Sequence, residues 1–130
     1  MAPTALQVSC VQLHWARPLE VNLARALHYI HAAADAGSRV VLFPEANLTS
    51  YYFPYATGLD PEAVDDALRQ GCAAAAQRGI WTIMGTIRKT KDRFLNLAHV
   101  ISPKGEIVYE YAKVNMAGRD EKKYCRGGNK

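Results

Sequence analysis

Hydrophobic and polar residues alternate in the first segment of the chain, and the spacing then becomes helical. Alternation over most of Ala5 to Trp15, with several Val and Leu, predicts a buried strand. From Pro18 to Gly37 an apolar stripe recurs every three or four residues, which predicts an amphipathic helix that ends at the glycine. The stripe consists of Leu19, Leu23, Leu27, Ile30 and Ala34. The run Arg39 to Phe43 is typical of a parallel strand covered on both faces, so we expect a βαβ unit.

The middle of the chain predicts a second helix followed by an antiparallel meander. Glu45 to Asp60 is rich in aromatic residues and broken by proline and glycine, as in an ordered loop. Asp60-Pro61-Glu62 is a strong helix start, and the helix is expected to end at Gly79. Its expected buried face is Val64, Ala67, Leu68 and Ala75. Three strands follow, at Ile80 to Ile87, Phe94 to Ile101 and Glu106 to Ala112, with turns at Arg88 to Arg93 and Ser102 to Gly105.

Composition excludes several classes of protein. The chain has 130 residues, of which 49% are hydrophobic and 22% charged, so it is neither disordered nor collagen-like nor a coiled coil. No apolar run approaches the roughly 20 residues of a membrane helix. After residue 87 there are 11 Lys and Arg against 5 Asp and Glu. These cations lie near predicted turns without an aromatic platform, so we expect no nucleic-acid partner.

Cysteine and histidine usage argues against disulfides and metal sites. The three cysteines, Cys10, Cys72 and Cys125, are odd in number and widely spaced, and Met1 to Thr4 lacks the pattern of a secretory signal. We therefore expect a reduced, cytoplasmic protein. Cys10 on a strand and Cys72 on a helix are expected to be buried thiols. The histidines show no shared metal spacing, so we expect neither metal nor cofactor.

Three charged residues are candidates for chemistry. Glu45 directly follows the second strand, and ligand sites in open α/β sheets lie beyond the carboxyl ends of parallel strands. An apolar flank and a preceding proline suit a general base, whereas a surface glutamate that begins a loop is the alternative. Lys113 ends the last strand, where most lysines are solvated. Glu121 lies in what is, on its own, a charged loop.

Together these segments resemble the first half of the carbon-nitrogen hydrolase family, the nitrilase superfamily. The similar segments are Gln7 to Gln12, Arg39 to Glu45 with its Phe-Pro-Glu ending, Asn96-Leu-Ala, and Ser102 to Lys113. The order and spacing of the segments together are more specific for this family than any single segment is. Ala112 departs from the family, in which an arginine is common at this place. The resemblance implies an α/β fold, the α-β-β-α sandwich, of which residues 1–130 supply the N-terminal half.

The resemblance also implies roles for the three candidates. Glu45 would be the general base, Lys113 the cation that stabilises the tetrahedral intermediate, and Glu121 the second glutamate that positions the lysine. The nucleophile would be a cysteine beyond residue 130, which leaves this segment inactive alone. Cys125 precedes a glycine-containing loop and is expected to be a loop residue.

The implied activity is hydrolysis of an amide, carbamoyl compound or nitrile, with a homo-oligomer expected for the full-length protein. Residues 1–130 alone are expected to expose an apolar sheet face and self-associate. A non-catalytic binding or assembly module with the same sheet is the alternative from another class. A nucleotide-binding βαβ domain is disfavoured, because His14 to Arg17 contains no glycine-rich phosphate loop after the first strand.

Overall fold

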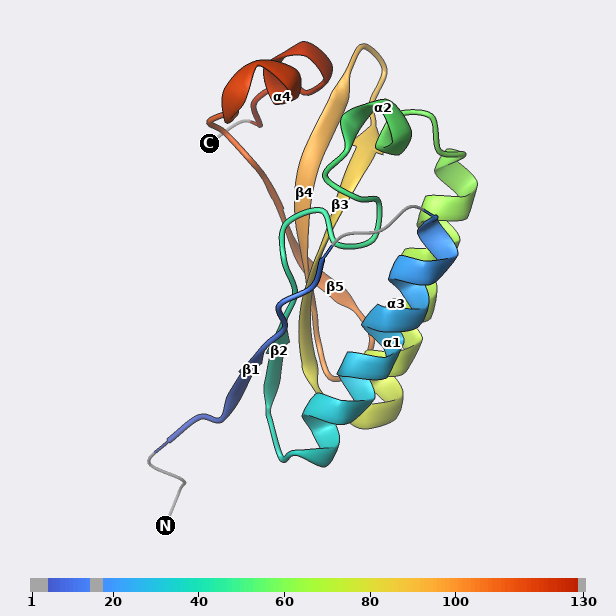
Figure 1. Cartoon of the computed structure of the whole chain (residues 1–130). Helices are drawn as coiled ribbons and strands as arrows, with labels where there is room; N and C mark the ends of the chain where they lie inside the picture. Colours follow the sequence, from blue (N-terminus) through green and yellow to red (C-terminus); the bar gives the residue numbers. More distant parts are fainter. Residues whose placement is uncertain (1–4, 15–17, 129–130) are drawn as a thin grey trace.

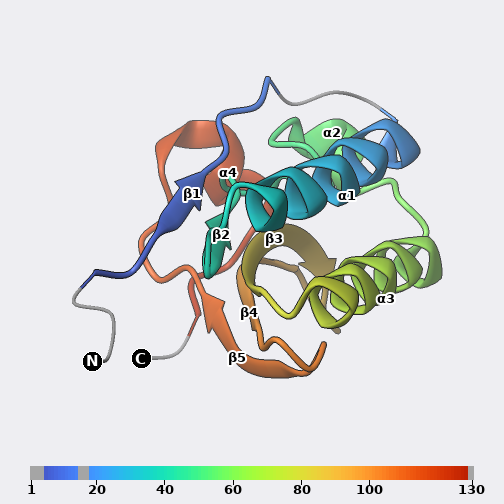
Figure 2. The ribbon, with the colours of Figure 1, turned by 90° about the horizontal axis from the view of Figure 1, so that it is seen from below.

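The computed structural model describes residues 5–14 and 18–128, which form a five-stranded sheet with two long helices on one face (Figure 1). The strands are β1 (Val8–Cys10), β2 (Val40–Leu42), β3 (Trp81–Lys89), β4 (Phe94–Ile101) and β5 (Ile107–Ala112). The helices are α1 (Leu19–Asp35), α2 (Phe53–Ala56), α3 (Pro61–Arg78) and α4 (Gly118–Tyr124). Figure 2 shows α1 and α3 side by side along the same face of the sheet.

The strands lie in the sheet in chain order, β1-β2-β3-β4-β5. The β1–β2 and β2–β3 pairs are parallel, and the β3–β4 and β4–β5 pairs are antiparallel. Four strands, all except β4, therefore run in one direction, and their carboxyl ends lie at the edge where β4 begins. The predicted βαβαβ order with a following meander is confirmed.

Helix α3 begins and ends as its sequence predicts. The side chain of Asp60 accepts a hydrogen bond from the N–H of Glu62, and Pro61 occupies the first turn. Gly79 ends the helix with φ +61°, in the left-handed region that glycine adopts at little cost. All four residues of the predicted buried face are buried. This face packs on β3 and on α1.

Helix α1 begins at Leu19, with Pro18 as its N-cap, and its buried face is rotated from the predicted stripe. Leu19 and Ile30 are buried as expected, but the deepest positions also include Ala26 and Ala33. The other members of the stripe are partly buried and pack against the same core. Small alanines at the centre of the face let α1 approach its neighbours closely, which puts the larger leucines at the margin.

The predictions for two strands and for two cysteines were wrong. The first strand is limited to Val8–Cys10, which pair in register with β2, and these residues are exposed or half-buried rather than buried; Trp15 lies outside the described residues. β2 is covered on one face, with Val41 buried and Leu42 40% exposed. Cys10 is exposed rather than buried, because its register with Leu42 places it on that same uncovered face. Cys72 is only partly buried.

The face of the sheet opposite α1 and α3 is apolar and exposed. The strand register places one set of large side chains on it, each between 37% and 60% exposed: Val8, Leu42, Trp81, Tyr109 and Tyr111. The expected exposed apolar face is therefore present. Among the residues that the structure describes, no helix has the length and apolar character needed to cross a membrane.

Candidate active site

Glu45 lies just beyond β2 on a segment that still follows β3. The N–H of Phe43 donates to the carbonyl of Ile83 at 2.9 Å, so the backbone pairing continues past the end of the strand. Ala46 then has φ +52°, which is uncommon for a residue other than glycine. Ala46 is fully buried, so the chain turns sharply while it is packed on both sides. The backbone that carries the Glu45 carboxylate is therefore fixed.

Side chains of the next residues replace a missing strand along β3. The amide oxygen of Asn47 accepts the N–H of Gly85, and the hydroxyl of Thr49 accepts the N–H of Ile87, both at 2.8 Å. The N–H of Leu48 donates to the carbonyl of Gly85 at 3.1 Å. These bonds satisfy the backbone of β3 where no regular partner strand continues.

Gly85 permits the close approach of this segment. A Cβ atom at position 85 would lie 2.5 Å from the backbone nitrogen of Ala46 and 3.2 Å from its Cα. Both are backbone atoms, which cannot move without displacing the residue next to Glu45. Glycine is thus required here by space.

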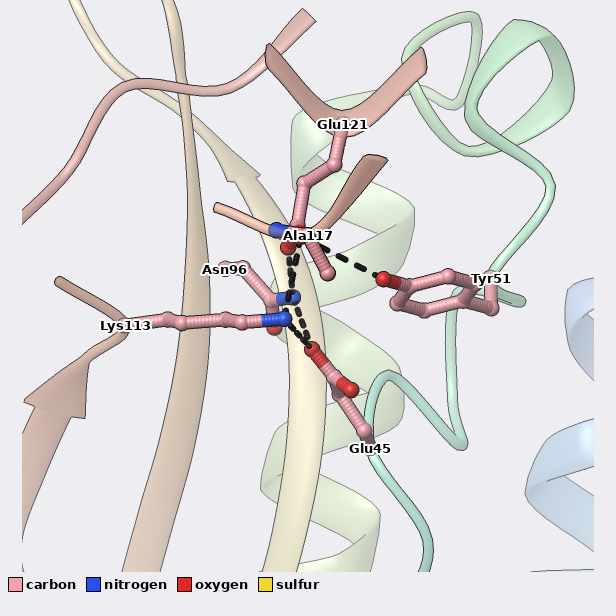
Figure 3. Close-up of polar contacts among 6 residues, drawn as sticks. All are labelled: Glu45, Tyr51, Asn96, Lys113, Ala117 and Glu121. Atoms are coloured by element: carbon pink, nitrogen blue, oxygen red, sulfur yellow. Dashed lines mark hydrogen bonds and ion pairs between the residues drawn. The ribbon is translucent and has the colours of Figure 1, made fainter. Parts of the chain in front are cut away.

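Lys113 follows the end of β5 and reaches both candidate glutamates (Figure 3). Its backbone N–H donates to the carbonyl of Asn96 at 2.9 Å, which continues the β4–β5 pairing. Its Nζ donates to Oε1 of Glu45 at 2.8 Å and to Oε2 of Glu121 at 2.9 Å. The three residues predicted from the sequence are therefore brought together at the carboxyl edge of the sheet.

Glu121 does not lie in a charged loop, as its neighbours suggested, but on the short helix α4. It is 1% exposed, whereas Arg119 and Asp120 are exposed on the same helix. Its carboxylate accepts hydrogen bonds from Lys113, from the N–H of Ala117 at 2.6 Å and from the hydroxyl of Tyr51 at 3.3 Å. The burial of Glu121 could not be predicted from its charged neighbours, because Glu121 is the one side chain of this charged run that faces inward.

Asn96 is a site residue that the sequence reasoning did not single out. Its Nδ2 donates to Oε1 of Glu45 at 2.5 Å and to Oε1 of Glu121 at 2.8 Å. It is 3% exposed and lies between apolar residues on β4. A buried asparagine in a strand needs specific partners, and this signal was available in the sequence.

The aromatic loop contributes one residue to this cluster. Tyr51 donates to Glu121, and its ring centroid lies 5.9 Å from Nζ of Lys113. Phe53 instead packs in a small core and stacks on Tyr124, while the hydroxyl of Tyr55 accepts the N–H of Leu19. Tyr51 therefore links the aromatic loop to the charged cluster.

The network favours opposite charges on Lys113 and Glu121. Burial alone would lower the pKa of Lys113, but hydrogen bonds to Glu45 and Glu121 outweigh it and hold the pKa well above its ordinary value. Burial would raise the pKa of Glu121, yet its hydrogen bonds from Asn96, Lys113 and Ala117 hold that pKa below its ordinary value. Lys113 is therefore a cation and Glu121 an anion at neutral pH.

A cavity of about 440 Å³ opens beside the cluster. Its walls include apolar residues of β2, β3 and β4, among them Leu42, Ile83 and Ala98, and the polar groups of Glu45, Asn96 and Lys113 lie at one part of the wall. A pocket with apolar walls and a few convergent polar groups is typical of a small-molecule site. The side chain of Glu45 is 45% exposed, so it is accessible to a substrate.

The three cysteines differ in their surroundings. Cys10 is exposed, and Cys72 is partly exposed on α3, where burial raises its pKa. Cys125 is 1% exposed and packs with Phe53 and Ile87. Burial, and next the charge of Glu121, raise its pKa to about 11, the reverse of an activated nucleophile. Within residues 5–14 and 18–128, no group of His, Cys, Asp and Glu could hold a metal ion.

Sequence comparison matches residues 7–130 to the family model of the carbon-nitrogen hydrolases. The omega-amidase NIT2 of Danio rerio is 26% identical over 115 residues, which cover 85% of this chain and 40% of that protein. The chain therefore spans well under half the length of that curated relative.

Solved structures of one amidase have the same fold. A cysteine-to-alanine mutant of the Nesterenkonia AN1 amidase, from the nitrilase superfamily, superimposes with a TM-score of 0.87 at 25% identity, over 96% of this chain and 49% of that one. A glutamate-to-leucine mutant of that amidase, with a TM-score of 0.85 at 23% identity over 96% and 49% of the two chains, carries the acetamide moiety of fluoroacetamide covalently at its active-site cysteine. The expected nitrilase-like fold is thus confirmed, over about half of the amidase chain.

Proposed function

Because the chain belongs to the carbon-nitrogen hydrolase family, we propose that the full-length protein hydrolyses a non-peptide carbon–nitrogen bond by a Cys-Glu-Lys mechanism. The substrate would be a small amide, carbamoyl compound or nitrile. The observation that carries the proposal is the contact of one ammonium, Lys113 Nζ, with the carboxylates of both Glu45 and Glu121 beside an accessible cavity. Amidases among the relatives support the amide as the first substrate to test.

In this proposal Glu45 moves the protons. Both of its hydrogen bonds from described residues end on Oε1, which leaves Oε2 as the oxygen for proton transfer. Oε2 takes the proton of a cysteine thiol as the sulfur attacks the substrate carbon, and returns that proton to the departing nitrogen. With an amide substrate, ammonia or an amine leaves and a thioester remains; with a nitrile, the sulfur first forms a thioimidate, which must add one water before ammonia leaves. Glu45 then deprotonates a water that attacks the thioester, which releases the acid and restores the thiol.

Lys113 stabilises the charge that develops in the reaction. Two of its three ammonium hydrogens are donated to Glu45 and Glu121, so the third can point at the substrate oxygen. The oxyanion of the tetrahedral intermediate exists only after attack, and a fixed cation beside it lowers the barrier. Glu121, buried and held by four donors, keeps the ammonium in place.

The nucleophile in this proposal is a cysteine outside residues 1–130. The buried, high-pKa thiol of Cys125 and the positions of Cys10 on β1 and Cys72 on α3 all argue against these three. Residues 1–130 would then be part of a catalytic domain that is completed by other residues of the full-length protein, which we propose assembles as a homo-oligomer.

Release of ammonia or amine from a panel of amides, nitriles and carbamoyl compounds tests the proposal. The full-length protein should turn over at least one class, and Glu45→Gln should lower kcat by about 10²- to 10⁴-fold because the general base is lost. Glu62→Gln on the exposed surface of α3 is the matched control and should retain wild-type rates. Undiminished activity in Glu45→Gln would contradict the assignment of Glu45 as the general base. A folded protein that turns over none of the panel would favour the non-catalytic module.

A further inference from the structure

We propose that Asn96 is a positioning residue for the reaction, and that its side-chain amide holds the two glutamates in their separate roles. The inference rests on the proposed function, since it assigns a task within that site. Asn96 Nδ2 donates one hydrogen to Oε1 of Glu45 and the other to Oε1 of Glu121. Both partners are carboxylate oxygens, so the nitrogen of the amide must be the atom that faces them.

The hydrogen bonds of the cluster form a closed ring. Asn96 and Lys113 each donate to Glu45 and to Glu121, so two donors alternate with two acceptors. Glu45 receives both bonds on one oxygen and keeps the other available. Glu121 accepts hydrogen bonds on both of its oxygens, so neither oxygen is left available for proton transfer. The ring therefore makes one carboxylate reactive and the other fixed.

A neutral donor is what this ring requires. Two carboxylates and one ammonium carry a net charge of −1, and the carboxylates repel each other at short range. Asn96 binds both without adding charge, so Lys113 remains the cation that faces the substrate. A second cation at position 96 would compete for Glu45 and weaken it as a base.

Asn96 also fixes the backbone of Lys113. The backbone carbonyl of Asn96 accepts the N–H of Lys113 at 2.9 Å. On its other side, Asn96 pairs in antiparallel register with Ile87 of β3. The side chain is 3% exposed and leaves a central strand, so its position is determined by the sheet. One residue on an interior strand thus contacts all three members of the proposed machinery.

Two substitutions in the full-length protein test this role. Asn96→Ala removes both donors, and Asn96→Asp keeps the shape but replaces the donors with a third carboxylate. We expect kcat for the best amide to fall about 10²-fold in Asn96→Ala, with KM changed far less, because misplacing a catalytic group by about 1 Å has an effect of this size. Asn96→Asp should be at least as impaired. The acidic limb of the pH profile of kcat/KM should move to higher pH in both variants.

The matched control is Ser102→Ala, just beyond the far end of the same strand. The Ser102 hydroxyl accepts the N–H of Lys104 at 3.2 Å and of Glu106 at 3.3 Å, remote from the glutamates. This variant should lose some thermal stability and keep the wild-type pH profile. If Asn96→Ala is folded and keeps kcat and the acidic limb within about twofold of wild type, or if its loss is explained by stability alone as in Ser102→Ala, the role is overturned.

A second readout does not depend on turnover. The hydrogen bond from Asn96 is one of the causes that hold the pKa of Glu121 low, so thermal stability should fall less steeply in Asn96→Ala than in wild type as the solution is acidified below about pH 4.5. If wild type shows no hydrolysis but this flattening is present, the proposed function fails while the positioning of Glu121 by Asn96 stands. If hydrolysis is present and neither the shift of the kcat/KM profile nor the flattening of the stability profile is seen, the inference about Asn96 fails alone.

Discussion

At the scale of single residues, the site depends on one buried carboxylate and the cation that it holds. Glu121 is 1% exposed and accepts hydrogen bonds from two side chains of the ring, from Tyr51 and from the N–H of Ala117. A buried charge is tolerated only when it is paired and hydrogen-bonded, so the contacts of Glu121 in the proposed site also stabilise the fold. Stability and activity should therefore share a pH dependence on the acidic side.

The sign of that pH dependence follows from the pKa shifts. The pKa of Glu121 is lowered from its ordinary 4.5 in the folded protein, so its contribution is fully present above about pH 4.5 and is lost as the pH falls through the folded value. We expect Glu121→Gln to lower the free energy of unfolding by about 2 kcal/mol at pH 7, as for the loss of hydrogen bonds to a charged group. Between pH 3 and pH 7, the Tm of this variant should change less with pH than the Tm of wild type. An unchanged acid limb would contradict the account.

At the scale of elements, the segment after β2 positions Glu45. Ala46 and Ser50, at its two ends, both have positive φ, and all of residues 46–50 are buried. Bonds from Asn47 and Thr49 tie it to β3. Such a strained and buried connection persists only when its surroundings determine it fully, as expected next to a functional side chain.

Gly85→Ala should disturb this segment and the reaction together. The added Cβ meets backbone atoms of Ala46, so the chain beside Glu45 must shift; overpacking of this kind costs about 1–3 kcal/mol. Gly58→Ala is the control, because its Cβ would make ordinary contacts at 3.5 Å and 3.6 Å. In the full-length protein, Gly85→Ala should lower both the Tm measured by calorimetry and kcat, whereas Gly58→Ala should change both only slightly. Equal behaviour of the two variants would contradict this role for the segment.

The elements show what the sequence could and could not predict. The strand Phe94–Ile101 and the helix after Asp60 were predicted well, because alternation, capping and a terminal glycine are local signals. Glu45 and Lys113 were candidates because they end strands, and the resemblance assigned their roles. The helix around Glu121 was missed because its run of charged residues is typical of a loop. Asn96 was recognisable as a polar residue among apolar ones, but its two partners are distant in the chain, so its role was missed. The short β1 reflects the same limit: its length is set by pairing with β2.

At the scale of the whole molecule, the sheet has one covered and one exposed face. Helices α1 and α3 cover the first, and Figure 2 shows both on the same side. The second carries Leu42, Trp81 and Tyr109 in the open. An exposed apolar patch of this kind in an isolated segment favours association.

Residues 1–130 expressed alone should therefore sediment as species larger than a monomer. The double variant Trp81→Glu/Tyr109→Glu should reduce this association, because it places charge on the exposed face. Tyr29→Glu changes an aromatic residue on α1 that is as exposed as Trp81, on the opposite side of the molecule, and should not reduce association. A monomer with a sharp thermal transition, seen by sedimentation and calorimetry, would contradict the prediction.

The central claim is that Glu45 and Lys113 serve a cysteine nucleophile, and trapping that cysteine tests it most directly. Full-length Glu45→Gln would be incubated with fluoroacetamide and mapped by peptide mass spectrometry, beside wild type, which should turn the compound over instead, and Glu45→Gln/Lys113→Met. The account predicts a covalent acetamide moiety on one cysteine other than Cys10, Cys72 and Cys125, formed more slowly without Lys113. No adduct on any cysteine, or an adduct on one of these three, would contradict it.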